Sequence, residues 1–306
     1  MLTDEQFATA IDCEGCVGIN RFKTPYGRVN YSARISLAMN HSAIPTSFHV
    51  RFGGSLNRQR NSKGYFESFR WEMVGNRQTG PVLYALLPHL TVKQDQARNV
   101  IKFLESRSHS NDFESFWKLA KELNHQNFAT DNPREAVLSI PQLATAMDCE
   151  GAFGINKFRH PKWVFKYAVR MTLGMQHPSI PKAMCKTFGG SVWAENNPRG
   201  NALHRWSLIG NQSSEAVLRA LLPHLIVKQD RAQNLLDYLA FYHSTTRHVI
   251  NRPSEEMERF ETFFQKAKAL NLPAPATTER IGPVTGCDSL NSEETRRESS
   301  EAGIPA

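Results

Sequence analysis

Hydrophobic positions along the first 124 residues change period several times, and each change predicts a new element. Apolar side chains recur at helical spacing over 3–13, where Thr3 followed by Gln6 predicts a capped helix start. Residues 31–39 instead alternate apolar and polar side chains, which is typical of a strand with one buried face. The same reasoning predicts strands at 17–23, 55–60 and 66–74 with a polar turn at 61–64, a short helix with Pro45 before 52–54, and helices at 81–87, 93–106 and 113–123.

The second half of the chain repeats this pattern. Long segments recur in the same order: FGGS of 52–55 at 188–191, LLPHLTVKQDQA of 86–97 as LLPHLIVKQDRA at 221–232, and FESFWKLAKELN of 113–124 as FETFFQKAKALN at 260–271. The duplication predicts an α+β protein of two pseudo-symmetric αββαββα repeats, each with an extra helix. Each repeat should form a saddle-like antiparallel sheet backed by helices, and the repeats should join at a two-helix interface.

Composition divides the chain into four parts. We expect a first repeat at 1–124, a linker at 125–138, a second repeat at 139–271 and a tail at 272–306. The linker contains Asn, Asp and Pro, which favour loops. The tail is rich in Pro, Thr, Ser, Glu and Gly, so we expect it to be disordered and assign it no chemistry.

The chain carries a formal net charge of +8, unevenly distributed. Six acidic residues and three arginines give 273–306 a charge of −3, so the residues before it carry +11. Such an excess favours a polyanionic partner, most simply nucleic acid. No run of eighteen apolar residues predicts a membrane span, and the acidic start MLTDEQF resembles neither a signal nor a transit peptide. A soluble, intracellular protein is therefore expected, while the host compartment stays open.

Cysteine and histidine residues predict no metal centre of their own. Cys13 and Cys16 form a CxxC pair, but the second repeat has Ala152 three residues after Cys149. The five cysteines therefore read as reduced thiols that pack against helices. The eleven histidines show no paired ligand spacing and suggest no zinc.

One stretch near the start of each repeat carries the chemistry. FATAIDCEG at 7–15 recurs as LATAMDCEG at 143–151, and each copy ends a helical run with an acid and a glycine. Thr and Cys stand four residues apart in both copies, so they share one helix face. A helix face with such small side chains lets two helices approach closely. If these helices pack side by side, Glu14 and Glu150 emerge together, and paired carboxylates in a basic protein favour a divalent cation aimed at phosphate.

These nine-residue segments resemble the LAGLIDADG motif of homing endonucleases. They match it at the apolar first and fifth positions, the following Ala, the acids at the sixth and eighth positions and the closing Gly. They depart with Thr for the first Gly, Ala for the second Leu, Cys for the second Ala and Glu for the second Asp. The resemblance implies a monomeric, site-specific endonuclease for double-stranded DNA that uses Mg²⁺ or Mn²⁺, with Ca²⁺ in a non-cleaving complex. It implies a long asymmetric target, cut once on each strand across the minor groove.

The resemblance also assigns residues. Glu14 and Glu150 would each hold a divalent cation, with the peptide carbonyls of Cys13 and Cys149 as further ligands. The acids two residues before each Glu point to another face and read as structural, bonding backbone near the helix interface.

Further catalytic candidates lie outside the motif. Lys93 and Lys228, in VKQDQA and VKQDRA, match a basic position beside the family's active site and would stabilise phosphate charge. Asn40 and Gln176 end the second strand of each repeat, where the family often has a side chain that positions water.

Polar faces of the strands are the candidates for reading DNA. A twisted sheet of long side chains fits the major groove, where Arg reads guanine and Asn or Gln reads adenine. By strand parity the candidates are Asn20, Arg34, Asn57, Gln59 and Arg70 in the first repeat, and Asn156, Arg170, Trp193 and Arg205 in the second. Because the repeats differ on these faces, we expect a target that is not a perfect palindrome.

Two other functions remain open on the sequence alone. The same scaffold could serve as a maturase that binds its host intron RNA, or as a DNA-binding regulator that has lost cleavage. The presence of both acids and both lysines argues against a pure maturase without excluding a dual role.

Overall fold

The computed structural model describes residues 2–60, 67–106, 112–125, 137–160, 163–196, 202–245 and 253–272. The predicted turn at 61–64, nearly all of the linker, and the tail after its first residue, with Cys287, lie outside this description. Within it, no helix is both long and apolar enough to cross a membrane.

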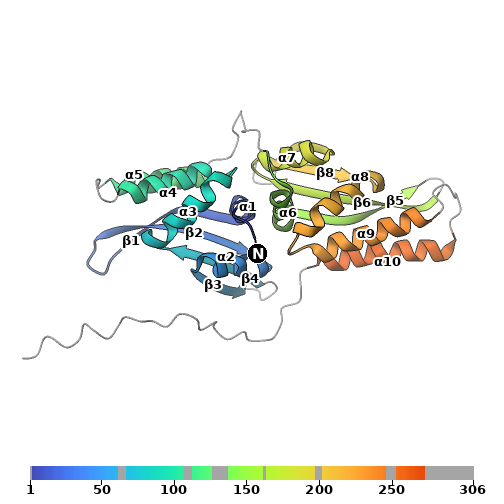
Figure 1. The fold of residues 1–306 in the computed structure, drawn as a ribbon, viewed down its shortest axis with the longest axis horizontal. Helices are drawn as coiled ribbons and strands as arrows, with labels where there is room; N and C mark the ends of the chain where they lie inside the picture. The colour runs from blue at the N-terminus through green and yellow to red at the C-terminus, as the bar shows by residue number, and fades with distance from the viewer. Residues whose placement is uncertain are drawn as a thin grey trace, which may run out of the picture.

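The predicted αββαββα order appears in both repeats (Figure 1). The first repeat contains α1 (Asp4–Glu14), β1 (Gly15–Lys23), β2 (Val29–Met39), α2 (Ala43–Phe52), β3 (Ser55–Arg60), β4 (Glu67–Val74), α3 (Asn76–Leu86), the 3₁₀ turn η1 (Leu87–His89), α4 (Gln94–Ser106) and α5 (Phe113–His125). The second contains α6 (Ile140–Glu150), β5 (Gly151–His160), β6 (Trp163–Met175), α7 (Ser179–Phe188), β7 (Ser191–Asn196), β8 (Ala202–Ile209), α8 (Asn211–Leu221), η2 (Leu222–His224), α9 (Gln229–Ser244) and α10 (Ser254–Asn271).

Two details differ from the expected αββαββα unit with one extra helix. The helices predicted at 93–106 and 113–123 are both present, as α4 and α5, so two helices follow the unit and not one. The helix expected at 81–87 begins at Asn76 and holds Pro81 in its interior. Proline usually opens a helix, because it lacks the N–H of an interior position, and this preference misplaced the predicted start.

Each repeat builds one four-stranded antiparallel sheet, in the order β1-β2-β4-β3 or β5-β6-β8-β7. The first strand pairs with the second through a direct hairpin, and the fourth strand inserts between the second and third. One face of each sheet carries the core, with Ile35, Leu37 and Trp71 fully buried in the first repeat. The other face, which we call the open face, carries most of the polar strand residues.

Both motif helices begin with a side-chain cap, of which the sequence predicted the one at Thr3. The amide of Gln6 donates to Oγ1 of Thr3 at 3.3 Å, and the amide of Thr3 donates to Oε1 of Gln6 at 3.1 Å. In α6 the amide of Ser139 donates to Oε1 of Gln142 at 3.0 Å. These caps satisfy amides that have no partner within the helix, so both helices of the repeated motif have a fixed beginning.

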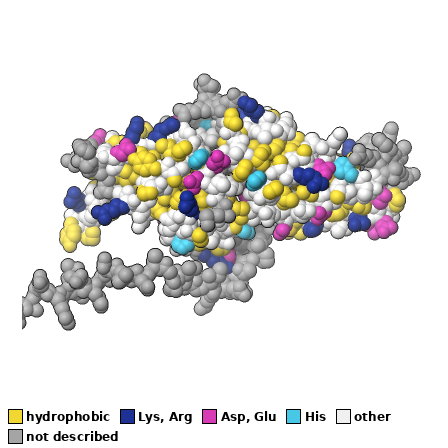
Figure 2. Space-filling model, in the orientation of Figure 1, with side chains coloured by type: hydrophobic (Ala, Val, Ile, Leu, Met, Phe, Trp, Pro, Cys, Tyr) yellow, Lys and Arg dark blue, Asp and Glu magenta, His cyan; other side chains and the backbone are white. Residues whose placement is uncertain are grey.

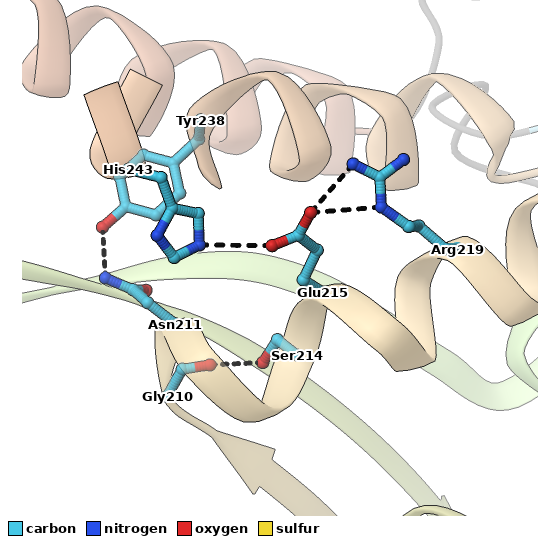
Figure 3. Close-up of polar contacts among 7 residues, drawn as sticks. All are labelled: Gly210, Asn211, Ser214, Glu215, Arg219, Tyr238 and His243. Carbon is cyan, nitrogen blue, oxygen red and sulfur yellow. Dashed lines mark hydrogen bonds and ion pairs between the residues drawn. The ribbon is translucent and has the colours of Figure 1, made fainter. Parts of the chain in front are cut away.

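Buried polar contacts lock the outer helices to the sheets. In the second repeat Oδ1 of Asn211 accepts from the amide of Val169 at 2.9 Å, and its Nδ2 donates to the hydroxyl of Tyr238 at 3.0 Å (Figure 3). On the neighbouring turn of α8, Glu215 lies between Arg219 and His243 (Figure 3). These contacts tie α8 and α9 to β6, so the segment that leads into α9 has a defined position.

The last helix of each repeat is held by three residues at equivalent positions, a glutamate that accepts from one basic side chain and one tyrosine. Glu114 of α5 accepts from Arg21 and Tyr31, while Glu261 of α10 accepts from Lys157 at 2.7 Å and from Tyr167 at 2.6 Å. The two repeats thus share tertiary contacts as well as element order. In Figure 1 α4 and α5 border one half of the molecule and α9 and α10 border the opposite side of the other half, as an approximate twofold rotation requires.

Candidate functional site

Helices α1 and α6 pack side by side at the centre of the molecule (Figure 1). Their contact contains buried Thr9 and Thr145, and Nε2 of Gln6 donates to Oγ1 of Thr145 at 3.3 Å. Further along, the thiol of Cys13 interacts with that of Cys149, and this neighbour together with burial raises the pKa of Cys13 well above its ordinary value. The four described cysteines are free thiols, as expected. These small side chains bring the C-terminal ends of both helices together.

The closing glycine of each motif is required by close approach. A Cβ on Gly15 would lie 2.7 Å from Cα of Ile11, and one on Gly151 would lie 2.7 Å from Cα of Met147. Both glycines have ordinary φ values of −86° and −83°, so backbone strain is not the reason. Each chain turns directly from helix into strand at this point, and only a residue without a side chain fits beneath the preceding turn.

Asp12 and Asp148 are structural, as the sequence suggested. The Asp12 carboxylate accepts from the amides of Thr91, Val92 and Lys93 at 2.6, 3.1 and 2.8 Å. Asp148 accepts the three equivalent bonds in the second repeat. Burial outweighs these bonds and raises the pKa of Asp12 to about 6. The contacts fix the entries to α4 and α9 against the ends of the motif helices.

Glu14 and Glu150 lie half-buried at the two helix ends and interact with each other. Burial raises the pKa of both carboxyls, and the charge of Glu14 helps raise that of Glu150 to about 7. Lys93 and Lys228 oppose the shift in both cases. The four side chains therefore form one electrostatic group, drawn equally from the two repeats.

The lysines of this group contact the helix ends rather than solvent. Nζ of Lys93 donates to the carbonyl of Ile11 at 2.6 Å and to that of Asp12 at 2.9 Å. Cation and carbonyl dipoles attract at a helix C-terminus, so these bonds secure the turn that ends in Glu14. Burial lowers the pKa of Lys93, and the nearby acids oppose this.

Lys228 is held more deeply, with only 7% of its surface exposed. Its Nζ donates to the carbonyls of Met147 at 2.8 Å, Gly151 at 2.7 Å and Cys149 at 3.5 Å. The Cys149 carbonyl, a metal ligand by resemblance, thus accepts a hydrogen bond from a lysine in this structure, whereas Lys93 donates to the carbonyls of Ile11 and Asp12 and not to that of Cys13. The two halves of the group are similar without being identical.

The donor set suits a hard divalent cation. Two carboxylates repel each other at the helix ends, and a bound cation would remove this repulsion. Among the described residues no cluster of three His, Cys, Asp or Glu side chains is present, so a cation here would need backbone carbonyls and water as further ligands. Mg²⁺ accepts such a site, because it binds one or two carboxylates and keeps several waters.

Asn40 and Gln176 lie directly after β2 and β6, and both are exposed. Within the described part of the chain, no hydrogen bond joins either residue to Glu14 or Glu150. Their assignment as water-positioning residues stays a prediction.

The nine residues predicted to read DNA all lie on the open faces. In the first sheet Arg70 is opposite Asn57, and Gln59 is opposite Ser68. Arg34 is opposite Gly18, and its Nε lies 2.5 Å from Oε1 of Glu72. Asn20 shares this face by strand parity.

The open face of the second sheet has a different arrangement. Arg170 is exposed, and the register gives Ser207 the place that Glu72 has in the first sheet. Trp193 is 40% exposed opposite Arg205, whose Nη2 lies 2.6 Å from Oε1 of Glu195. On the face drawn in Figure 2, Lys and Arg side chains are scattered rather than gathered into one patch.

Sequence reasoning missed several residues near these surfaces. Phe22 and Phe158 occupy equivalent exposed positions on the open faces, and so do Val74 and Ile209. The ion pairs of Glu72 with Arg34 and of Glu195 with Arg205 were also missed. Strand parity could have assigned the four apolar residues to the open faces, but a search for polar side chains passes over them. Arg231, whose charge repels Lys228, was missed because its counterpart in the first repeat is Gln96.

Comparison with known proteins gives a structural match only. No family model and no curated protein sequence matches the chain. Among solved structures, the I-SmaMI LAGLIDADG homing endonuclease bound to cleaved DNA matches with a TM-score of 0.70 at 14% identity, covering 89% of this chain and 99% of that one. The I-LtrWI LAGLIDADG homing endonuclease bound to target DNA matches with a TM-score of 0.64 at 13% identity, over 86% and 96% of the chains. I-SmaMI bound to an uncleaved DNA target in the presence of calcium ions matches with a TM-score of 0.60 at 12% identity, over 87% and 98%. The chain therefore has the fold of the LAGLIDADG homing endonucleases.

Proposed function

We propose that this protein is a single-chain homing endonuclease that binds a long, asymmetric duplex and cuts both strands. The observation that carries the proposal is the pairing of Glu14 and Glu150 between two open-faced sheets. Each acid ends one motif helix, so an approximate twofold axis relates them as it relates the two strands of DNA. The DNA bound by the structurally similar I-SmaMI and I-LtrWI endonucleases supports the substrate class.

Glu14 and Glu150 would hold divalent cations, Mg²⁺ in the working enzyme, together with the carbonyl oxygens at the helix ends. A bound cation would stabilise negative charge on the phosphate and make a coordinated water more acidic. Hydrolysis then adds the oxygen of a water to phosphorus, and the bridging ester oxygen leaves with a proton. The calcium ions present with I-SmaMI and its uncleaved DNA target agree with an oxygen-rich site.

Lys93 and Lys228 would supply fixed positive charge beside each scissile phosphate. Burial lowers their pKa values, yet the surrounding acids and carbonyls favour the ammonium form. A preorganised ammonium stabilises charge that develops on the phosphate without reorienting at the moment of reaction. Because both ammonium groups also bind the helix ends, these lysines would position the acids as well.

The open faces would read the target in the major groove. Arg34, Asn57 and Arg70 would serve one half-site, and Arg170 and Trp193 the other. A strand of about eight residues spans roughly 26 Å, close to eight base-pair steps of about 3.4 Å. Two such faces therefore fit a site of roughly sixteen base pairs or more.

A plasmid that carries the intron-free insertion locus tests this function. The purified protein, incubated with Mg²⁺, should linearise that plasmid and should leave it intact in EDTA. A gel shift without cleavage would instead identify a DNA-binding regulator. Splicing of the host intron RNA without any DNA cleavage would identify a maturase, and either result would overturn the proposal.

A further inference from the structure

Arg231 is a cation beside the candidate site that the first repeat lacks. It is the third residue of α9, three positions after Lys228, and it is partly buried. The segments VKQDQA and VKQDRA align it with Gln96 of the first repeat. The two halves of the site therefore differ by one positive charge at the same place.

Arg231 does not take over the structural role of Gln96. Nε2 of Gln96 donates to the carbonyl of Leu123 at 3.0 Å and so ties α4 to α5. One turn later the repeats agree, because Asn99 and Asn234 each donate to a carbonyl of the last helix. No such bond, and no ion pair, involves Arg231 among the residues that the structure describes, so helix packing does not account for an arginine here.

The position is electrostatically unfavourable for a cation in the free protein. The first turn of a helix carries the positive end of its dipole. Lys228 stands three positions before Arg231, so the two cationic side chains lie on the same side of the helix start, where their charges repel. Partial burial removes hydration from Arg231 and lowers the pKa of its guanidinium. Asp148 alone opposes these effects, and its carboxylate already accepts three backbone bonds.

A positive charge that forms no ion pair among the described residues of the free protein suits an anion that arrives with the ligand. We propose that Arg231 binds a DNA backbone phosphate beside the cut in the C-terminal half-site, a contact that the N-terminal half-site lacks. The proposal rests on the proposed function, since it takes the duplex as the ligand. A guanidinium presents a planar fork that fits phosphate oxygens, and the phosphate would offset the repulsion from Lys228. The contact would hold the two strands unequally, so we expect them to be cut at unequal rates.

Salt dependence of binding tests the contact directly. The probe is a duplex of about 24 base pairs that the wild-type protein selects from a randomised pool in buffer without Mg²⁺. Each phosphate neutralised by the protein contributes about −0.9 to the slope of log K against log salt concentration. Arg231→Gln, which installs the residue of the first repeat, should make this slope about 0.9 less steep and weaken binding about tenfold at 0.1 M salt. Arg231→Lys should keep the slope.

The matched control is Arg219→Gln, which removes one positive charge from the exposed surface of α8 in the same repeat. It should change neither slope nor affinity. Thermal unfolding separates a binding role from a structural one: Arg231→Gln should leave the melting temperature unchanged or raise it, whereas a structural arginine would lower it. A wild-type slope and affinity in Arg231→Gln would overturn the inference, as would a clear loss of stability.

Strand-specific cleavage provides the second measurement. With the selected duplex labelled on one strand or the other, Arg231→Gln should narrow the difference between the two cutting rates. If the wild-type protein binds and cuts this duplex and Arg231→Gln behaves identically, only the role of Arg231 is refuted. Wild-type protein that binds no duplex would refute both that role and the proposed function.

Discussion

At the scale of single residues, burial and neighbouring charges act in opposite directions on the pKa values of the candidate site. Each motif supplies one buried aspartate that accepts backbone amides and one half-buried glutamate that meets its counterpart. The sequence distinguished these roles, because residues two apart on a helix point to different faces. It could not show that Lys228 would be buried against three carbonyls, because these contacts join positions about eighty residues apart.

Glu150 should make stability depend on pH in metal-free protein. Its pKa is about 7 in the folded protein against an ordinary 4.5, so between these pH values the carboxylate takes up a proton when the protein folds. Its contribution is fully present below the unfolded pKa and is lost as pH rises through the folded one. Glu150→Gln, which cannot ionise, should therefore be more stable than wild type at pH 8 by about 1–2 kcal/mol, after discounting for partial exposure, and equal at pH 4. Denaturant unfolding in EDTA measures this, and a less stable variant at pH 8 would contradict it.

Asp12 should matter for folding more than Glu14 does. Asp12→Ala would leave three amides without their acceptor, at a cost of about 1–3 kcal/mol for each group that stays buried. We expect a loss of about 3 kcal/mol or more in the free energy of unfolding. Glu14→Ala is the control, since Glu14 caps no such loop, and it should be near neutral. Equal losses in the two variants would show that the two acids share one structural role.

At the scale of elements, the motif works by joining a helix directly to a strand. The sequence predicted both elements, because the period of the apolar positions changes at Gly15 and again at Gly151. It also indicated that α1 and α6 would meet, since both present small side chains at the same spacing. It could not place the start of α3 at Asn76, because proline prefers the first turn of a helix and Pro81 lies inside this one. The packing of the helix overrides that local preference.

Gly151→Ala should disturb this junction. The added Cβ would lie 2.7 Å from Cα of Met147, which is backbone and cannot move aside. We expect a loss of about 1–3 kcal/mol in stability and a displaced Glu150. Gly154→Ala, three residues later in the same strand, is the matched control because its Cβ would meet nothing within 4 Å. Unfolding curves for both variants give the comparison, and equal stabilities would contradict the close approach.

At the scale of the whole molecule, duplication provides symmetry and the differences between repeats break it. The sequence predicted which residues share the open faces, since strand parity is a local property. It could not pair Arg34 with Glu72, because that contact depends on the register between β2 and β4, which are joined through α2 and β3. The second sheet has Ser207 in that place, so Arg170 has no acid beside it there.

Glu72→Ser should therefore make the first sheet resemble the second. If the open face binds DNA as proposed, releasing Arg34 and removing an acid from that face should tighten duplex binding by about twofold to fivefold. Glu122→Ser, which removes an acid from the exposed side of α5, should change binding little. Titration of a labelled duplex at fixed salt gives both affinities. Unchanged or weaker binding by Glu72→Ser would show that this ion pair does not restrain Arg34 at the DNA surface.

The central claim is that the two helix-end acids each serve one strand of a bound duplex. The most direct measurement is strand-resolved cleavage of a selected, end-labelled duplex in Mg²⁺ by wild type, Glu14→Gln and Glu150→Gln, with affinity measured in parallel. Both variants should bind like wild type, and double-strand breaks should fall by about a hundredfold or more. Cutting of both strands at the wild-type rate by both variants would contradict the claim.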